Sequence, residues 1–217
     1  MLGNFSHFII IAPPILLALT IHEVAHGWIA YKLGDPTAKN AGRLTLNPLP
    51  HLDPIGTILL FIAHIGWAKP VPVNPMYFQN PKRDLMWVSL AGPVSNLGLA
   101  LIFGLIFRII PKASLITATG MSRVIVVMLI YAVVINLVLA IFNLIPIPPL
   151  DGSKILMGFA PRELEAQLLQ LERFGPMLVV GLVLIGSLLH FPILWMVMKP
   201  FISFFSILFA GMDLSAI

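Results

Sequence analysis

The sequence predicts an all-α polytopic membrane protein with about five transmembrane helices and a re-entrant loop or short β-hairpin between the first and second spans. Of its 217 residues, 59% are hydrophobic and only 10% are charged, whereas soluble domains contain about 25% charged residues. Its mean hydropathy is +0.98, and several apolar runs approach the ~20 residues that cross a hydrocarbon core. The intervening segments are too short for another domain, so residues 1–217 are expected to form one membrane-embedded domain.

The first expected span covers residues 5–33. Pro13 and Pro14 should either kink this helix or mark where it begins, because proline disrupts a helix interior. The tripeptide Gly34-Asp35-Pro36 carries the glycine and proline signals of a helix end.

Between the first and second spans the pattern becomes irregular. Residues 42–48 alternate briefly, which predicts a short strand, and residues 55–65 are apolar but too short to cross. The proline-rich residues 66–75 cannot be helical. Such backbone is tolerated at membrane depth only beside protein or a water-filled cavity, so we expect it to lie against the polar site described below.

Further apolar runs predict the remaining spans, at residues 85–107, 124–144, 176–189 and 193–210. Lys199 and Pro200 interrupt the last of these, so whether it crosses fully stays open. Residues 162–173 form a short charged run typical of an amphipathic helix on the membrane surface.

The first span contains the pattern H-E-x-x-H. On a helix, His22 and His26 lie four residues apart on one face, about 6 Å apart along the axis, so both can reach one metal ion. Glu23 is turned about 100° from His22, where it can hold a metal-bound water, as in zinc hydrolases. The alternative is a pair of core histidines with a buried glutamate, which would leave three costly ionisable groups without a cation.

A third ligand must also be His, Asp or Glu, because the chain has no cysteine. Asp151 follows a proline-rich stop after the third span, still among apolar residues, and is the candidate; its alternative role is to cap the next helix. One crossing between the first and third spans brings their ends to the same side. Asn96, in the second span, either makes an interhelical hydrogen bond or acts at the site.

The basic residues are unevenly distributed between the two sides of the membrane. Nine fall in the segments on the motif side and three in the segment on the other, so the positive-inside rule predicts a cytoplasmic site and an outside N-terminus. The formal net charge of +4 comes from residues scattered at helix ends, which suits anionic lipid headgroups and argues against a nucleic-acid partner.

These motifs together resemble the site-2 protease family of intramembrane zinc metalloproteases. The first motif is residues 22–26, and residues 143–152 resemble the N-x-x-P-x-x-x-L-D-G element. Residues 92–96 resemble the G-x-x-x-N element, and residues 66–75 are similar to the family's membrane-associated β-loop. The resemblance covers roughly residues 15–160, without the PDZ-like or CBS-like inserts of larger members.

The resemblance implies a zinc-dependent intramembrane endopeptidase that cleaves transmembrane segments of membrane-anchored proteins. His22, His26 and Asp151 would bind one Zn²⁺ per chain, and Glu23 would be the general base. Asn143 would help orient the substrate backbone, and Asn96 is expected to take part in substrate binding. Its partners would be a transmembrane-helix substrate and the lipid bilayer; neither the substrate's identity nor the oligomeric state follows.

Two other function classes fit part of the pattern. A divalent-metal transporter or binding protein could use the same His/Asp cluster, but a transporter is expected to carry polar residues along several spans or paired repeats. A catalytically idle membrane scaffold would not need the complete H-E-x-x-H and L-D-G motifs.

Overall fold

The computed structural model describes residues 2–63, 66–111, 117–188 and 192–216, and all regular elements in these ranges are helices. The helices are α1 (Leu2–Lys32), α2 (Thr37–Asn40), α3 (Pro54–Ala63), α4 (Pro81–Ile109), α6 (Gly120–Asn143), α7 (Asp151–Phe159), α8 (Arg162–Glu172), α9 (Gly175–Leu188) and α10 (Ile193–Ala210), with 3₁₀ turns at Leu49–His51 and Pro75–Tyr77.

Four helices in this part of the chain are long and apolar enough to cross a membrane: α1 from Ile9 onward, α4, α6 and α10. The polytopic all-helical class is therefore confirmed. The expected fifth span corresponds to α9, which has 14 described residues, about 21 Å of helix against a hydrocarbon core of about 30 Å. That span stays a prediction. α1 continues through Pro13 and Pro14.

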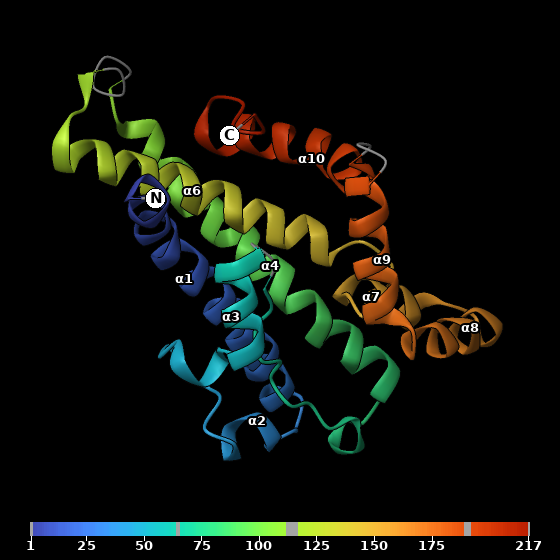
Figure 1. The fold of residues 1–217 in the computed structure, drawn as a ribbon. Helices are drawn as coiled ribbons and strands as arrows, with labels where there is room; N and C mark the ends of the chain where they lie inside the picture. The colour runs from blue at the N-terminus through green and yellow to red at the C-terminus, as the bar shows by residue number, and fades with distance from the viewer. Residues whose placement is uncertain (1, 64–65, 112–116, 189–191, 217) are drawn as a thin grey trace.

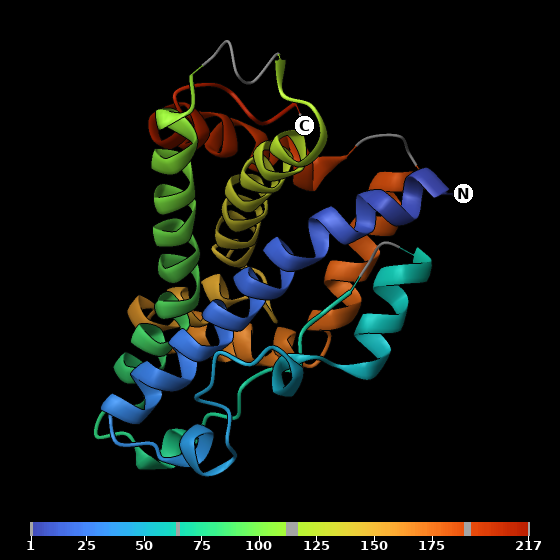
Figure 2. The same ribbon diagram turned by 90° about the vertical axis from the view of Figure 1, so that its left-hand side faces the viewer.

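Helices α1, α4 and α6 pack side by side, with α4 running antiparallel to the other two (Figures 1 and 2). The main apolar core lies between α4, α6 and α10 and includes Phe107, Leu137 and Ile202. A smaller one joins α1 and α4 through Ala30, Phe78 and Val88. The C-terminal ends of α1 and α6 and the N-terminal end of α4 therefore point toward the same side of the bundle.

The strand expected at residues 42–48 is wrong: the structure has turns and bends there. Gly42 adopts a positive φ of 67°, and the side chain of Asn47 accepts the N–H of Leu49 (3.1 Å). A side chain thus accepts a backbone N–H that would otherwise be free to pair with a neighbouring strand. The bridge between Leu52 and Ala68 is the one sheet-type pairing in the described residues, so the hairpin form of the expected loop is not found.

The other expectations for this region agree with the structure. The apolar segment before the prolines forms only the ten-residue α3, with Asp53 accepting the N–H of Gly56 (2.8 Å) at its start. Residues 66–74 contain no helix, as their prolines predict, and Pro75, the last residue of the proline-rich stretch, begins the 3₁₀ turn Pro75–Tyr77. Whether this loop enters the bilayer stays a prediction.

The contact between α4 and α10 gives a stability test. A Cβ on Gly104 would lie 2.8 Å from the Cβ of Phe209, whereas Gly98 on the same helix faces open space. We expect Gly104→Leu to lower the free energy of unfolding by about 1–3 kcal/mol, because overpacking must separate the helices. Gly98→Leu, the matched control, should leave the thermal midpoint in detergent almost unchanged. Equal midpoints for the two variants would contradict this packing.

Candidate metal centre

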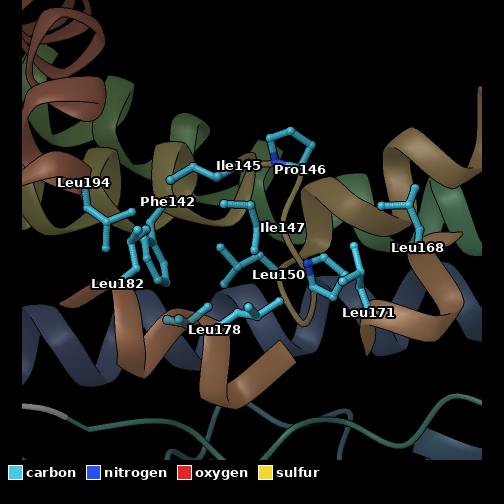
Figure 3. A pocket seen from close by; sticks show the side chains of 12 residues that line it. Phe142, Ile145, Pro146, Ile147, Leu150, Leu168, Leu171, Leu178, Leu182 and Leu194 are labelled. Carbon is cyan, nitrogen blue, oxygen red and sulfur yellow. The ribbon is translucent and has the colours of Figure 1, made fainter. Parts of the chain in front are cut away.

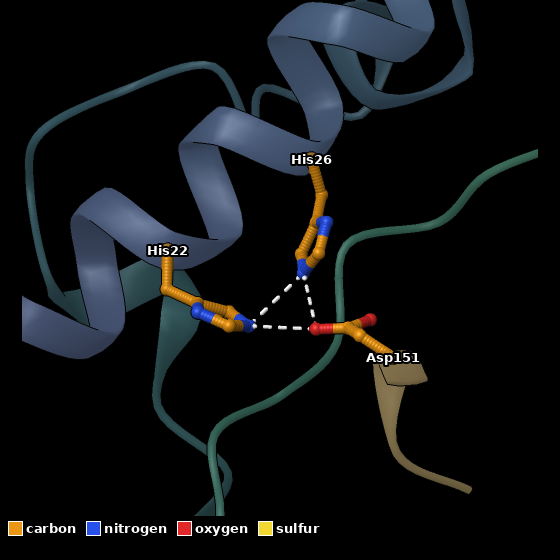
Figure 4. A group of neighbouring side chains, drawn as sticks. All are labelled: His22, His26 and Asp151. Carbon is orange, nitrogen blue, oxygen red and sulfur yellow. Dashed lines mark hydrogen bonds and ion pairs between the residues drawn. The ribbon is translucent and has the colours of Figure 1, made fainter. Parts of the chain in front are cut away.

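Three side chains from two distant parts of the sequence, the C-terminal part of α1 and the start of α7, meet at one point (Figure 4). His22 Nε2 and His26 Nε2 lie 3.0 Å apart. Each lies 3.2 Å from the Oδ2 atom of Asp151. The structure therefore brings together the three residues that the sequence predicts as ligands.

The loop after α6 delivers Asp151 to the two histidines. The prolines end α6 and Asp151 becomes the first residue of α7, whose N-cap makes no side-chain hydrogen bond. Asp151 is thus not serving as that helix's N-cap. Gly152 is required next to it, because a Cβ there would lie 2.5 Å from the carbonyl oxygen of Ile145 and against that of Leu144. Only glycine lets α7 start this close to the end of α6.

Helix α4 packs against the two histidines at a glycine, Gly92. A Cβ on Gly92 would lie 2.6 Å from His22 Nε2 and even closer to His26 Nε2. Any side chain at this position would occupy the space between the ligand atoms and α4. The glycine of the G-x-x-x-N element therefore leaves room for the cluster.

Each histidine is held through its other ring nitrogen. His22 Nδ1 donates to Asn96 Oδ1 (2.6 Å), and His26 Nδ1 donates to the carbonyl oxygen of Val88 (2.7 Å). A carbonyl only accepts, so these bonds put a proton on each Nδ1, and in the neutral form of the two rings both Nε2 atoms are lone pairs. Partners of this kind fix the ring orientation of metal-binding histidines.

The donor set fits a metal cation. The two Nε2 lone pairs face Asp151 Oδ2, a buried oxygen without a hydrogen-bond donor. Three electron-pair donors at this spacing repel one another unless a cation lies between them. Ligands of tetrahedral zinc, at about 2.0–2.1 Å from the metal, are roughly 3.3 Å apart, close to the observed separations.

Asn96 occupies a different place from the one expected for a substrate-binding residue. It is fully buried and its amide is committed to the protein interior, with Nδ2 donating to Asn136 Oδ1 (2.8 Å) and to the carbonyl oxygen of Ala18 (3.1 Å). Asn96 thus lies behind His22, and its expected part in substrate binding stays a prediction. Sequence reasoning missed Asn136, although a lone amide inside the most apolar span was a usable signal.

Asn143 is the last residue of α6, and its Nδ2 donates to the carbonyl oxygen of Leu139 (2.9 Å). It lies before the proline loop that carries Asp151 and is half-buried.

Glu23 is fastened to the proline-rich segment formed by residues 66–75. Its Oε2 accepts the N–H of Val71 (2.7 Å). The buried Arg43 donates to the carbonyl oxygens of Lys69 (2.6 Å) and Pro70 (3.2 Å). This segment is thus held against α1, beside the metal centre.

The segment's other end is anchored by Asp35, which is fully buried just beyond α1 and accepts the N–H of Asn74 (2.7 Å). The turn that follows the first helix therefore also fixes the proline-rich segment.

The loop carrying Asp151 also lines an apolar cavity of about 370 Å³ (Figure 3). Ile147 and Leu150 contribute from the loop, and Leu178 contributes from α9. An apolar group in this cavity would touch the residue that precedes Asp151.

Comparisons with known proteins agree with this site. The profile of "Peptidase family M50" matches residues 109–185. "Putative zinc metalloprotease YwhC" of Bacillus subtilis is 44% identical over 185 residues, which cover 83% of this chain and 82% of that protein. "Putative zinc metalloprotease Rip2" of Mycolicibacterium smegmatis is 34% identical over 188 residues, and the Rip2 of Mycobacterium tuberculosis (strain H37Rv) is 30% identical over 189, each covering 83% of this chain and 69% of the relative. No solved structure matches. The chain therefore belongs to peptidase family M50, the site-2 protease family of metalloproteases.

Proposed function

We propose that this protein is a zinc-dependent intramembrane endopeptidase that cleaves transmembrane segments of membrane-anchored proteins. In this proposal His22, His26 and Asp151 hold one zinc ion, and Glu23 is the general base. The observation that carries it is the convergence of three donor atoms, 3.0–3.2 Å apart, from α1 and α7. A zinc ion bound there would act as a Lewis acid and lower the pKa of a water molecule toward ~7.

The proposed role of Glu23 follows from its place beside His22. Its carboxylate would take a proton from the attacking water and later give it to the leaving amine. The N–H of Val71, 2.7 Å from Oε2, holds the carboxylate in one orientation. A fixed base needs less reorganisation when the substrate arrives.

Substrate binding involves the proline-rich segment in this proposal. A transmembrane helix hides its carbonyl groups in internal hydrogen bonds, so it must unwind before attack. Pro70, Pro72 and Pro75 have no N–H, and Glu23 and Asp35 take those of Val71 and Asn74. The N–H of Val73 has no hydrogen-bond partner among the described residues. An unwound substrate could pair with it by strand addition, with Asn143 helping to orient the substrate backbone.

The proposed orientation puts the metal centre toward the cytoplasm and the N-terminus outside. Its support is the excess of basic residues in the segments next to the centre.

The ligand set and the base are tested by variants that separate zinc binding from proteolysis. Glu23→Gln should keep one zinc per chain but lose at least about 100-fold in cleavage, the contribution typical of a general base. His22→Ala and Asp151→Ala should lose both. Zinc is measured by elemental analysis, and cleavage by mass spectrometry of membrane proteins trapped by Glu23→Gln and then exposed to wild-type enzyme. Full zinc content in Asp151→Ala would remove it from the ligand set; zinc uptake into vesicles without any cleavage would indicate a transporter instead.

Strand addition is tested at Val73. Val73→Pro removes the N–H and should lower cleavage by about tenfold or more, because one backbone hydrogen bond to the substrate is lost. Val73→Ala is the matched control, since it keeps the N–H and shortens the side chain. Zinc content should be unchanged in both. Equal cleavage by the two variants would rule out a hydrogen bond from this N–H.

The orientation is tested by thiol labelling, since the chain has no cysteine of its own. Asn40→Cys and Met121→Cys introduce exposed thiols at opposite ends of the bundle. A membrane-impermeant maleimide should label Met121→Cys in intact spheroplasts and Asn40→Cys only after permeabilisation. The reverse pattern would place the metal centre on the outside.

A further inference from the structure

A line of buried polar side chains connects α6 with the metal centre. Asn136 and Asn96 are fully buried. Asn136 Nδ2 donates to the carbonyl oxygen of Ala132 (2.8 Å). Asn96 Nδ2 donates to Asn136 Oδ1 (2.8 Å) and to the carbonyl oxygen of Ala18 (3.1 Å). Asn96 Oδ1 accepts from His22 Nδ1 (2.6 Å). Three helices therefore contribute to one continuous set of hydrogen bonds.

This set has only one consistent direction. The carbonyl oxygens of Ala132 and Ala18 can only accept, so the NH₂ groups of Asn136 and Asn96 must point toward them. Asn136 Oδ1 then faces Asn96, and Asn96 Oδ1 faces His22. The neutral His22 ring must therefore carry its proton on Nδ1, which leaves Nε2 as a lone pair beside Asp151.

The opposite orientation of the Asn96 amide would prevent His22 from binding a metal ion. If the Asn96 amide turned over, its NH₂ would face His22 Nδ1, and His22 would move its proton to Nε2. A protonated Nε2 cannot bind a metal ion. Two groups oppose this reversal: the carbonyl oxygen of Ala18 and Asn136 Oδ1.

We propose that Asn136 is a positioning residue for the metal centre: by accepting from Asn96 Nδ2 it fixes the Asn96 amide, and the amide fixes the tautomer of His22. This inference rests on the proposed role of His22 as a zinc ligand. Asn136 contacts no ligand atom and acts only through Asn96. This role also explains why an amide lies in the middle of α6, where an unpaired polar group would be strongly disfavoured.

The test uses the full-length protein in lipid nanodiscs. Asn136→Leu removes the acceptor and keeps four side-chain heavy atoms with the same branching at Cγ. Asn136→Asp is the conservative variant, because either form of a carboxyl group can accept from Asn96 Nδ2. Ser206→Ala is the matched control: Ser206 is buried in α10 and accepts the N–H of Leu214 (3.1 Å), far along the chain from His22.

Two quantities are measured for each protein. Nitrogen-15 NMR of histidine-labelled, metal-free protein reports which ring nitrogen of His22 carries the proton, with the signal assigned by its loss in His22→Gln. Competition with a chelator gives the dissociation constant for Zn²⁺. Wild type and Asn136→Asp should show the proton on Nδ1. Asn136→Leu should show a mixture of tautomers and bind zinc about 5–10-fold more weakly, less than the ~10–100-fold typical of direct partners of a ligand.

Three results would overturn the proposal: a wild-type His22 protonated on Nε2, an Asn136→Leu protein that matches Ser206→Ala in both quantities, or an Asn136→Asp protein that behaves like Asn136→Leu. The first needs no variant of Asn136 and holds even if the leucine variant does not fold. Failure of the proposed ligand set looks different, because His22→Ala would then bind zinc as tightly as wild type while the tautomers still followed residue 136.

Discussion

The repulsion between three electron-pair donors held 3.0–3.2 Å apart is the constraint on which the rest of the structure depends. Two imidazole lone pairs and one carboxylate oxygen face one another away from bulk water, an arrangement that is unfavourable without a cation. The surrounding helices are shaped to keep this spacing. Gly92 leaves room for the rings on α4, and Gly152 lets α7 begin against the end of α6. The packing energy of the bundle thus holds the donors together.

The same packing links the centre to residues that never touch it. Val88 and Asn96 on α4 orient the two imidazoles, and Asn136 on α6 orients Asn96. On the other side of α1, Glu23 joins the proline-rich segment through the N–H of Val71. Helix α1 therefore presents the two proposed ligands toward α4 and the proposed base toward the loop, because neighbouring residues on a helix point about 100° apart.

The parts of the metal centre that could be predicted are those marked by a pattern within a few consecutive residues. His22 and His26 share a face by helix periodicity, and Asp151 follows a proline stop that leaves a carboxylate among apolar residues. Their meeting also followed from counting crossings, since one span lies between them. The hydrogen-bond partners of the imidazole rings could not be predicted in this way. The partner of His26 is the backbone carbonyl oxygen of Val88, and every residue carries such a group. Asn136 was overlooked because its role depends on how α4 and α6 face each other. The strand at residues 42–48 failed because alternation over a few residues cannot show that Asn47 takes a backbone donor.

The central claim concerns the atoms around the metal, and X-ray absorption spectroscopy at the zinc edge measures them most directly. On purified protein containing one zinc per chain, the account predicts two imidazole nitrogens and one carboxylate oxygen at about 2.0–2.1 Å, with a fourth light atom from water. A shell with three or more imidazoles, or one without any imidazole, would contradict it.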